Sequence, residues 1–208
     1  MALRVFYDLE STGFSTARDR IVQIGACVDG EAPGFSALVN PDGVLVHPSA
    51  QRVHGLSDAV LAEAPVFAEV WAAFVVFVRK AAGPLQRVLL VGHNSWGFDD
   101  RLLTAELARH QLALPFDTET ADTLRTVRTL RFPGPCKLAA LVAHCVGVPH
   151  VGAHTALADA EAVRTVVQRW PDGPLALLTR PWGTPTPVRA TKRKECTSSS
   201  PGQVWTVS

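Results

Sequence analysis

The most informative stretch of the chain is Val5-Phe6-Tyr7-Asp8-Leu9-Glu10-Ser11-Thr12-Gly13, an apolar run that ends on two carboxylates. Side chains alternate across a β-strand, so Asp8 and Glu10 share one face and the apolar residues beside them share the other. Two anions this close repel each other, and a hard divalent cation would remove that cost. The simpler interpretation is a strand that runs into a solvated turn, and the stretch alone leaves both readings open.

Strands and helices follow this stretch in an order typical of an α/β domain. Apolar runs, helical periodicity and turn residues predict strands over 3–10, 21–28, 35–39 and 88–92, and helices over 65–83, 99–110, 123–130, 137–145 and 156–170. Three antiparallel strands followed by alternating helices and strands indicate a mixed five-stranded sheet flanked by helices, of the ribonuclease H-like kind.

The size and composition of the chain fit one folded domain with a short appendage. The 208 residues are enough to bury a core, and we expect the domain to span 1–183 and a Pro/Ser/Thr-rich basic tail to span 184–208. A formal net charge of +1 creates no overall field that would attract nucleic acid.

Membrane and secretion signals are not evident in the sequence. The longest apolar stretch, 70–78, has about half the length of a membrane span. The cysteines form no C-x-x-C pair, and no signal peptide is recognised before the first strand. We therefore expect an intracellular protein, cytoplasmic or nuclear, without a membrane partner.

Two later stretches carry further charged groups. Asp99 follows the run His93-Asn94-Ser95-Trp96-Gly97-Phe98 at the start of a helix, where capping is a common role for aspartate. Asp159 lies one turn into the last predicted helix among small apolar residues, and His154 precedes it on a loop. A lone charge on an apolar helix face needs a partner, so Asp159 is a candidate for a functional site.

Four carboxylates and one histidine together suit metal-dependent cleavage of a phosphodiester. The predicted metal ligands are Asp8, Glu10, Asp99 and Asp159. We expect them to hold two Mg²⁺ ions, with Mn²⁺ as a substitute, because hard oxygen ligands suit these ions better than zinc. Such a pair, about 4 Å apart, holds the scissile phosphate and activates a bound water. An imidazole is a suitable general base for that water, and this is the role expected of His154.

Three segments together resemble the exonuclease motifs of the DnaQ-like family in its DEDDh branch. They are Phe6-Tyr7-Asp8-Leu9-Glu10-Ser11-Thr12-Gly13, His93-Asn94 with Phe98-Asp99, and His154-x-x-x-x-Asp159. Segments similar to the three-prime repair exonuclease (TREX) subgroup lie at 55–61, 102–107 and 180–184. The resemblance covers about residues 3–184 and implies a ribonuclease H-like exonuclease fold.

The resemblance implies a 3′–5′ exonuclease that releases nucleoside 5′-monophosphates from DNA 3′ ends, preferably single-stranded or frayed. By this resemblance Asp8 bridges both metal ions, and Glu10 with Asp159 completes the ion on the nucleophile side. Asp99 holds the other ion largely through water, and His154 is the base. The implied substrate-binding residues are Leu9, Glu10, Ser11, Thr12, Phe14, Val53 and His154, of which Phe14 and Val53 wedge against the terminal base.

The chain departs from the TREX pattern in two places. It lacks a proline-rich loop between the third strand and the first helix, and it has Gly97 where a basic residue belongs in the second motif. The missing cation weakens the case for binding a second, non-scissile strand. TREX relatives pair through a sheet edge, so a homodimer is expected by analogy.

Two alternative functions stay open at this point. An exoribonuclease that trims RNA 3′ ends would use the same site, because discrimination rests on contacts to the 2′-hydroxyl that the sequence does not place. A nucleic-acid-binding module on an inactive exonuclease scaffold is the other, although no ligand is lost here. Among other residues, we expect a surface or turn role for Asp100 and His54, and a contact with nucleic acid for Trp96.

Overall fold

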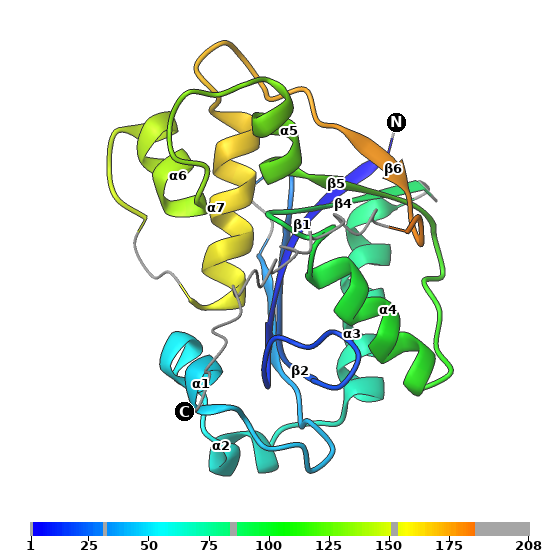
Figure 1. Cartoon of the computed structure of the whole chain (residues 1–208). Coiled ribbons are helices and arrows are strands. Elements are labelled where there is room, and N and C mark those ends of the chain that lie inside the picture. The colour runs from blue at the N-terminus through cyan, green and yellow to red at the C-terminus, as the bar shows by residue number, and fades with distance from the viewer. Residues whose placement is uncertain (1, 31–32, 84–86, 151–153, 186–208) are drawn as a thin grey trace, which may run out of the picture.

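One mixed sheet lies between two layers of helices (Figure 1). The computed structural model describes residues 2–30, 33–83, 87–150 and 154–185, so nearly all of the predicted tail lies outside the described residues. The strands, in spatial order, are β3 (Phe35–Leu38), β2 (Ile21–Val28), β1 (Leu3–Ser11), β4 (Arg87–Gly92), β5 (Asp117–Asp122) and β6 (Thr179–Pro181). β4 pairs in parallel with both β1 and β5, whereas the other neighbours are antiparallel.

The helices divide between the two faces of the sheet. They are α1 (Pro48–His54), α2 (Asp58–Ala62), α3 (Phe67–Ala82), α4 (Asp99–Arg109), α5 (Thr123–Thr129), α6 (Leu138–Val146) and α7 (Ala156–Gln168). α3 and α4 cover one face, and α7, backed by α6, covers the other (Figure 1). Within the described residues no helix is both long and apolar enough to span a membrane.

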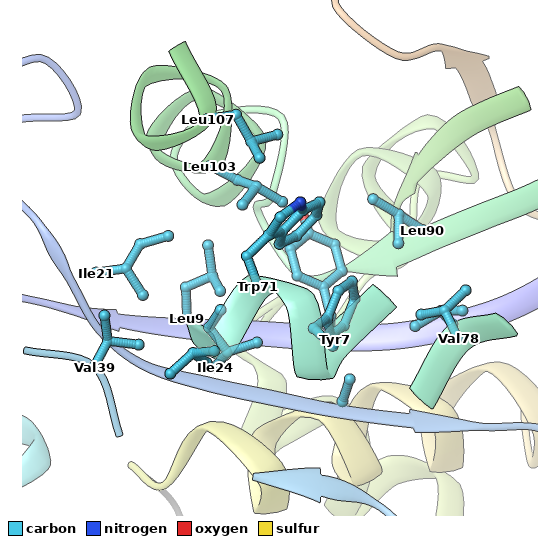
Figure 2. Close-up of a cluster of buried hydrophobic side chains, with 14 of the residues drawn as sticks. Tyr7, Leu9, Ile21, Ile24, Val39, Trp71, Val78, Leu90, Leu103 and Leu107 are labelled. Carbon is cyan, nitrogen blue, oxygen red and sulfur yellow. The ribbon is translucent and has the colours of Figure 1, made fainter. Parts of the chain in front are cut away.

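The alternation predicted for β1 sorts its side chains between these two layers. Val5, Tyr7 and Leu9 are buried against α3 and α4, and Figure 2 shows Tyr7 and Leu9 beside Trp71 and side chains of α4. Phe6 instead belongs to the cluster under α7. The even-numbered residues of β1 therefore face α7, so the side chains of Asp8 and Glu10 point toward that helix.

The sheet has six strands, not the five that were predicted. Two strands lie outside the predicted ranges. One is the short β6, and the other is β5, whose sequence Asp-Thr-Glu-Thr-Ala-Asp carries almost no apolar signal. It pairs with β4 on one side and β6 on the other, and its buried Thr118 and Thr120 are hydrogen-bonded. Threonine fits a pleated surface because it is β-branched. Backbone pairing with β4 and β6, together with the hydroxyl hydrogen bonds of Thr118 and Thr120, stabilises β5 in place of apolar burial.

Close contact between α7 and the sheet depends on Gly25 of β2. A Cβ built on Gly25 would lie 2.0 Å from the carbonyl carbon of Ala156 and 2.1 Å from the backbone nitrogen of Leu157. The side-chain oxygen of Gln23, two residues earlier on the same face, accepts the Ala156 N–H at 3.1 Å. β2 thus sets both the depth and the position of the first turn of α7, where Asp159 lies.

Candidate active site

Three carboxylates converge where the end of β1 meets the first turn of α7. Asp8 and Glu10 come from one face of β1, and Asp159 comes from α7. Each offers an oxygen, and these ligand atoms all lie within 4.8 Å of one another. Residues about 150 positions apart in the chain are therefore close enough to share a cation, and hard carboxylate oxygens are the donors that Mg²⁺ or Mn²⁺ prefers.

The fourth predicted ligand, Asp99, lines the same cavity. It is the first residue of α4 and only 6% exposed, and its Oδ1 accepts the backbone N–H of Leu9 at 3.2 Å. The cap position belongs to Phe98, so the alternative reading of Asp99 as an N-cap is wrong. A carboxylate in a first helical turn is favoured by the helix dipole, and here it reaches across to β1 beside Asp8.

A cavity of about 440 Å³ opens over these acids. Its walls combine the acidic groups with two exposed apolar side chains, Phe14 at 70% and Val53 at 44% exposure. The lining residues are Asp8, Leu9, Glu10, Ser11, Phe14, Ala50, Val53, His54, Asn94, Gly97, Phe98, Asp99, His154 and Asp159. An exposed phenylalanine beside a carboxylate cluster offers an apolar surface next to a charged one, which suits a ligand that has both characters.

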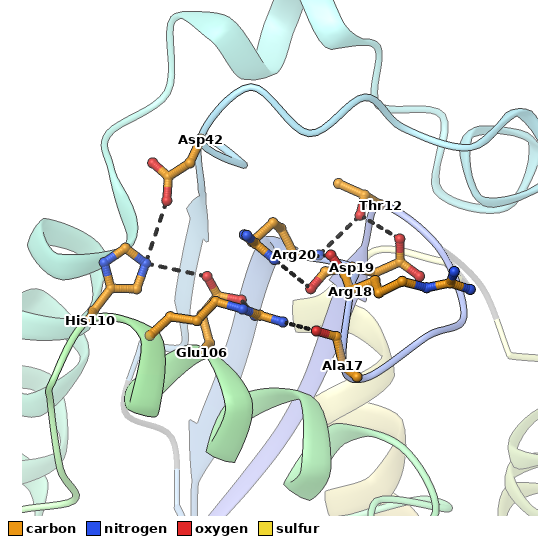
Figure 3. A network of polar contacts seen from close by, with 9 residues as sticks. Thr12, Ala17, Arg18, Asp19, Arg20, Asp42, Glu106 and His110 are labelled. Atoms are coloured by element: carbon orange, nitrogen blue, oxygen red, sulfur yellow. Dashed lines mark hydrogen bonds and ion pairs between the residues drawn. The ribbon is translucent and has the colours of Figure 1, made fainter.

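Thr12 is the one predicted site residue that the structure does not bring into the cavity lining. Its side chain is fully buried, and its hydroxyl donates to Asp19 and accepts the Arg20 N–H at 3.0 Å (Figure 3). The Ser11 hydroxyl also turns inward and donates to the Gly13 carbonyl at 2.6 Å. Both hydroxyls therefore shape the loop that carries Phe14, a role that the motif alone did not reveal.

The loop between β4 and α4 is held by Asp122, which also caps α5. The two carboxylate oxygens of Asp122 accept the backbone N–H groups of Asn94 and Trp96, at 3.0 and 3.2 Å. Asn94 has φ of 64°, a left-handed conformation that asparagine tolerates better than most residues. The fully buried Asp122 thus fixes the backbone that leads into Asp99.

One expectation about a residue near the site is wrong. Asp100 is buried, not at the surface, and accepts hydrogen bonds from Tyr7, Thr120 and Arg180. His54 lines the cavity, where its Nε2 lies 3.2 Å from the Ser11 carbonyl oxygen. Trp96 lies outside the cavity lining, and the Arg180 guanidinium sits 4.3 Å from the centre of its ring. The loop tryptophan therefore packs against β6.

Two histidines contact Asp159, and only one of them was predicted. His154 is exposed, lines the cavity and donates its backbone N–H to Asp159 Oδ2 at 3.0 Å, with φ of 73°. His150 was missed, although its Nε2 lies 2.7 Å from Asp159 Oδ1. The signal that could have found it is a second histidine on the same loop after the Gly147 helix end.

Burial and mutual repulsion make this acidic cluster a poor place for negative charge. Burial first, and then Asp99, Glu10 and Asp159, raise the pKa of Asp8 well above its usual range. Burial, and then the charges of Asp159 and Asp99, raise the pKa of Glu10 to about 8. Burial raises the pKa of Asp99 to about 7. A bound divalent cation would neutralise these carboxylates as protonation does, so the donor set fits such an ion.

The metal-free protein should lose stability as the pH rises through this range. The pKa of Glu10 lies at about 8 in the folded protein against an ordinary value of 4.5. The folded state therefore binds more protons than the unfolded state between these two values, and the free energy of unfolding falls as pH increases. Denaturant unfolding in chelator from about pH 5 to about pH 8 measures the slope.

Glu10→Gln should flatten this pH dependence, because the amide does not titrate. Glu119→Gln is the matched control, since Glu119 is a partly exposed carboxylate on β5 that pairs with Arg87. If the free energy of unfolding falls equally with pH in wild type and in Glu10→Gln, Glu10 does not cause the pH dependence.

Known proteins share both the sequence pattern and the fold. The model of the exonuclease (RNase_T) family matches residues 5–167. DNA polymerase III subunit epsilon of Treponema pallidum is 30% identical over 131 residues, which are 62% of this chain and 56% of that protein. Three prime repair exonuclease 2 of Homo sapiens is 32% identical over 151 residues, 61% of each.

Solved structures of exonuclease I have the same fold. The structure of Escherichia coli exonuclease I in complex with a dT13 oligonucleotide has a TM-score of 0.64 and 23% identity, and the match covers 83% of this chain and 42% of that one. The chain spans 56% and 61% of the two curated relatives described above. The predicted ribonuclease H-like fold and the DnaQ-like resemblance are confirmed. The chain belongs to the exonuclease family.

Proposed function

We propose that the protein is a metal-dependent 3′–5′ exonuclease of the DEDDh type that removes nucleoside 5′-monophosphates from DNA 3′ ends. The observation that carries the proposal is the cavity in which Asp8, Glu10, Asp99 and Asp159 meet beside exposed apolar side chains. Each of these acids is costly to bury as an anion, and no packing need explains four of them in one place.

In this mechanism Asp8, Glu10, Asp99 and Asp159 would hold the Mg²⁺ ions, since all four carboxylates line one cavity. Such ions supply charge neutralisation at the phosphate and an acidified water. His154, exposed at the cavity, would accept the proton of the attacking water through its imidazole. Phe14 and Val53 pack against the terminal base, which positions the last phosphodiester over the acids.

Single-stranded or frayed DNA is the substrate that we propose. An apolar platform accepts any base, because every base presents a π-face, so the enzyme should select for an end and not for a sequence. One relative is named as a three prime repair exonuclease, and the exonuclease I structure holds a dT13 oligonucleotide. Gly97 lines the cavity without a charge, so this position offers no cation for a second strand.

Digestion of a 3′-extended oligonucleotide, labelled at its 5′ end, tests the proposal. With Mg²⁺ we expect a ladder of products shortened one nucleotide at a time from the 3′ end, and no products in chelator. DNA and RNA of one sequence, run in parallel, separate the proposed activity from an exoribonuclease. Intact substrate despite measured Mn²⁺ binding would favour the inactive, nucleic-acid-binding alternative.

The role of His154 predicts a separation between rate and metal binding. His154→Ala should lower kcat by about 10²- to 10⁴-fold, the usual contribution of a general base, because the side chain that accepts the proton is lost. Mn²⁺ affinity should stay within about twofold, since no metal ligand changes. Isothermal titration calorimetry and single-turnover cleavage measure the two quantities. A parallel loss of both would exclude the base assignment.

Three further expectations stay as proposals. The exonuclease domain is proposed over 1–183, with the basic tail from 184 to 208 outside the catalytic unit, and the protein is proposed to act inside the cell. A homodimer would use a sheet edge, and β3 is an edge of the sheet in the part of the chain that the structure describes. Sedimentation equilibrium at micromolar concentration would measure the mass in solution.

A further inference from the structure

The loop between α6 and α7 contacts Asp159 through two separate groups. α6 ends at Gly147, which has φ of 75° and turns the chain toward the acidic cluster. The Nε2 atom of His150 then lies 2.7 Å from Asp159 Oδ1, and the backbone N–H of His154 donates to Oδ2 at 3.0 Å. Each oxygen of this carboxylate therefore has a partner on the same loop.

The His150 contact is a shielded one. The His150 side chain is 8% exposed and the Asp159 side chain 14% exposed, so water competes little for the bond. An ionised carboxylate can only accept hydrogen bonds, so Nε2 of His150 carries a hydrogen and donates it when Asp159 is charged. A charge-assisted bond of this kind is stronger than a neutral one and restricts the rotation of the carboxylate.

This bond leaves Asp159 able to bind a cation. An ionised carboxylate has about four lone-pair directions on its two oxygens, and the two loop contacts occupy two of them. An Asp159 oxygen lies within 4.8 Å of ligand oxygens from Asp8 and Glu10 in this same arrangement. His150 thus fixes the carboxylate in an orientation in which it already faces the other ligands.

The two histidines of the loop differ in their positions. His154 is exposed and lines the cavity, whereas His150 is nearly buried and is absent from the cavity lining. Only His154 therefore has access to a water or a substrate in the cavity, so His150 does not act as a base in its place. Its one described polar contact through the ring is with Asp159.

We propose that His150 is a positioning residue, which holds the Asp159 carboxylate in the orientation that metal binding requires. This inference rests on the proposed function, because it assumes that Asp159 is a ligand. Carboxylate ligands are commonly oriented by hydrogen bonds from outside the coordination sphere, and loss of such a partner costs about 10- to 100-fold in metal affinity or activity.

The decisive measurement is the Mn²⁺ affinity of the full chain without nucleic acid, by isothermal titration calorimetry. His150→Ala should weaken Mn²⁺ binding by about 10- to 100-fold. His150→Gln should recover most of that loss, because its side-chain amide can donate to Asp159 from a position close to that of Nε2. His144→Gln is the matched control, since His144 is an exposed histidine of α6 that packs against Phe132 and Trp170.

Cleavage assays separate positioning from catalysis. At saturating Mn²⁺ the kcat of His150→Ala should return to within a few-fold of the wild-type value, because a weakened site can still be filled. His154→Ala should stay slow under the same conditions. A catalytic role of His150 would not produce this difference, and a purely structural role would not produce the weaker Mn²⁺ binding.

The outcomes also separate this inference from the function on which it rests. If wild type binds no Mn²⁺, the proposed function fails first. If wild type binds Mn²⁺ and cleaves DNA, but His150→Ala binds Mn²⁺ equally well, the positioning role alone is overturned. A lower melting temperature of metal-free His150→Ala with unchanged Mn²⁺ affinity would likewise overturn it and assign His150 to loop anchoring.

Discussion

Asp8→Asn is expected to reduce cleavage by about a thousandfold or more while the protein stays folded. The proposed mechanism makes Asp8 a ligand of the metal ions, and metal-ion stabilisation of a transition state is worth several kcal/mol. A loss of about 4 kcal/mol corresponds to about a thousandfold in rate. The amide keeps the shape of the side chain but removes the charge that holds the cations. Single-turnover digestion of a labelled oligonucleotide measures the effect.

The same substitution should raise the melting temperature of the metal-free protein near pH 8. Burial and then the charges of Asp99, Glu10 and Asp159 raise the pKa of Asp8, so ionisation of this carboxyl group is less favourable in the folded state than in the unfolded state. An uncharged amide removes this cost. Thermal unfolding in chelator, followed by circular dichroism, measures the shift.

Asp117→Asn is the matched control for Asp8→Asn. Asp117 is an exposed carboxylate at the start of β5 and pairs only with the exposed Arg87 in the part of the chain that the structure describes. Neither activity nor melting temperature should change much, because exposed ion pairs contribute little. An active Asp8→Asn protein, or one that unfolds more easily without metal, would contradict the assignment of Asp8 as a metal ligand.

Gly25→Ala is expected to impair both stability and cleavage. The added Cβ would lie 2.0 Å from the backbone of Ala156, and Gly25 sits opposite Asp8 within the sheet, so neither partner can yield locally. Overpacking of this kind costs about 1–3 kcal/mol, and more where backbone atoms meet. The first turn of α7 would have to move away from β2, and Asp159 would move with it.

A displaced Asp159 should lower the cleavage rate by more than the stability loss explains. A misplacement of about 1 Å at a reacting centre can cost about a hundredfold. Urea unfolding gives the stability change, and cleavage at a temperature where the variant stays folded gives kcat. Ser36→Ala is the control, because Ser36 is the exposed residue of β3 that pairs with Gly25. This substitution should change neither the stability nor kcat. A fully active Gly25→Ala protein would show that α7 can retreat without moving the site.

Local sequence pattern predicted most of the sheet and helices of this protein. Alternation of side chains along residues 5–10 is a property of any extended backbone, so it assigned Asp8 and Glu10 to one face before their neighbours were known. The apolar runs of β2 and β4 and the periodicity of α3 gave those elements within one or two residues at most ends. β5 escaped because its sequence is polar, and it exists as a strand through its pairing with β4 and β6.

The sequence by itself determined which acidic groups and which histidine are candidates for the site, because their types and order carry the pattern of the exonuclease family. Only the tertiary structure decided the partners of these groups. It buried Asp100 against Tyr7 and placed His150 against Asp159. These contacts join residues of different elements or loops, so they depend on how closely α7 and α4 pack on the sheet and not on any local preference of the chain.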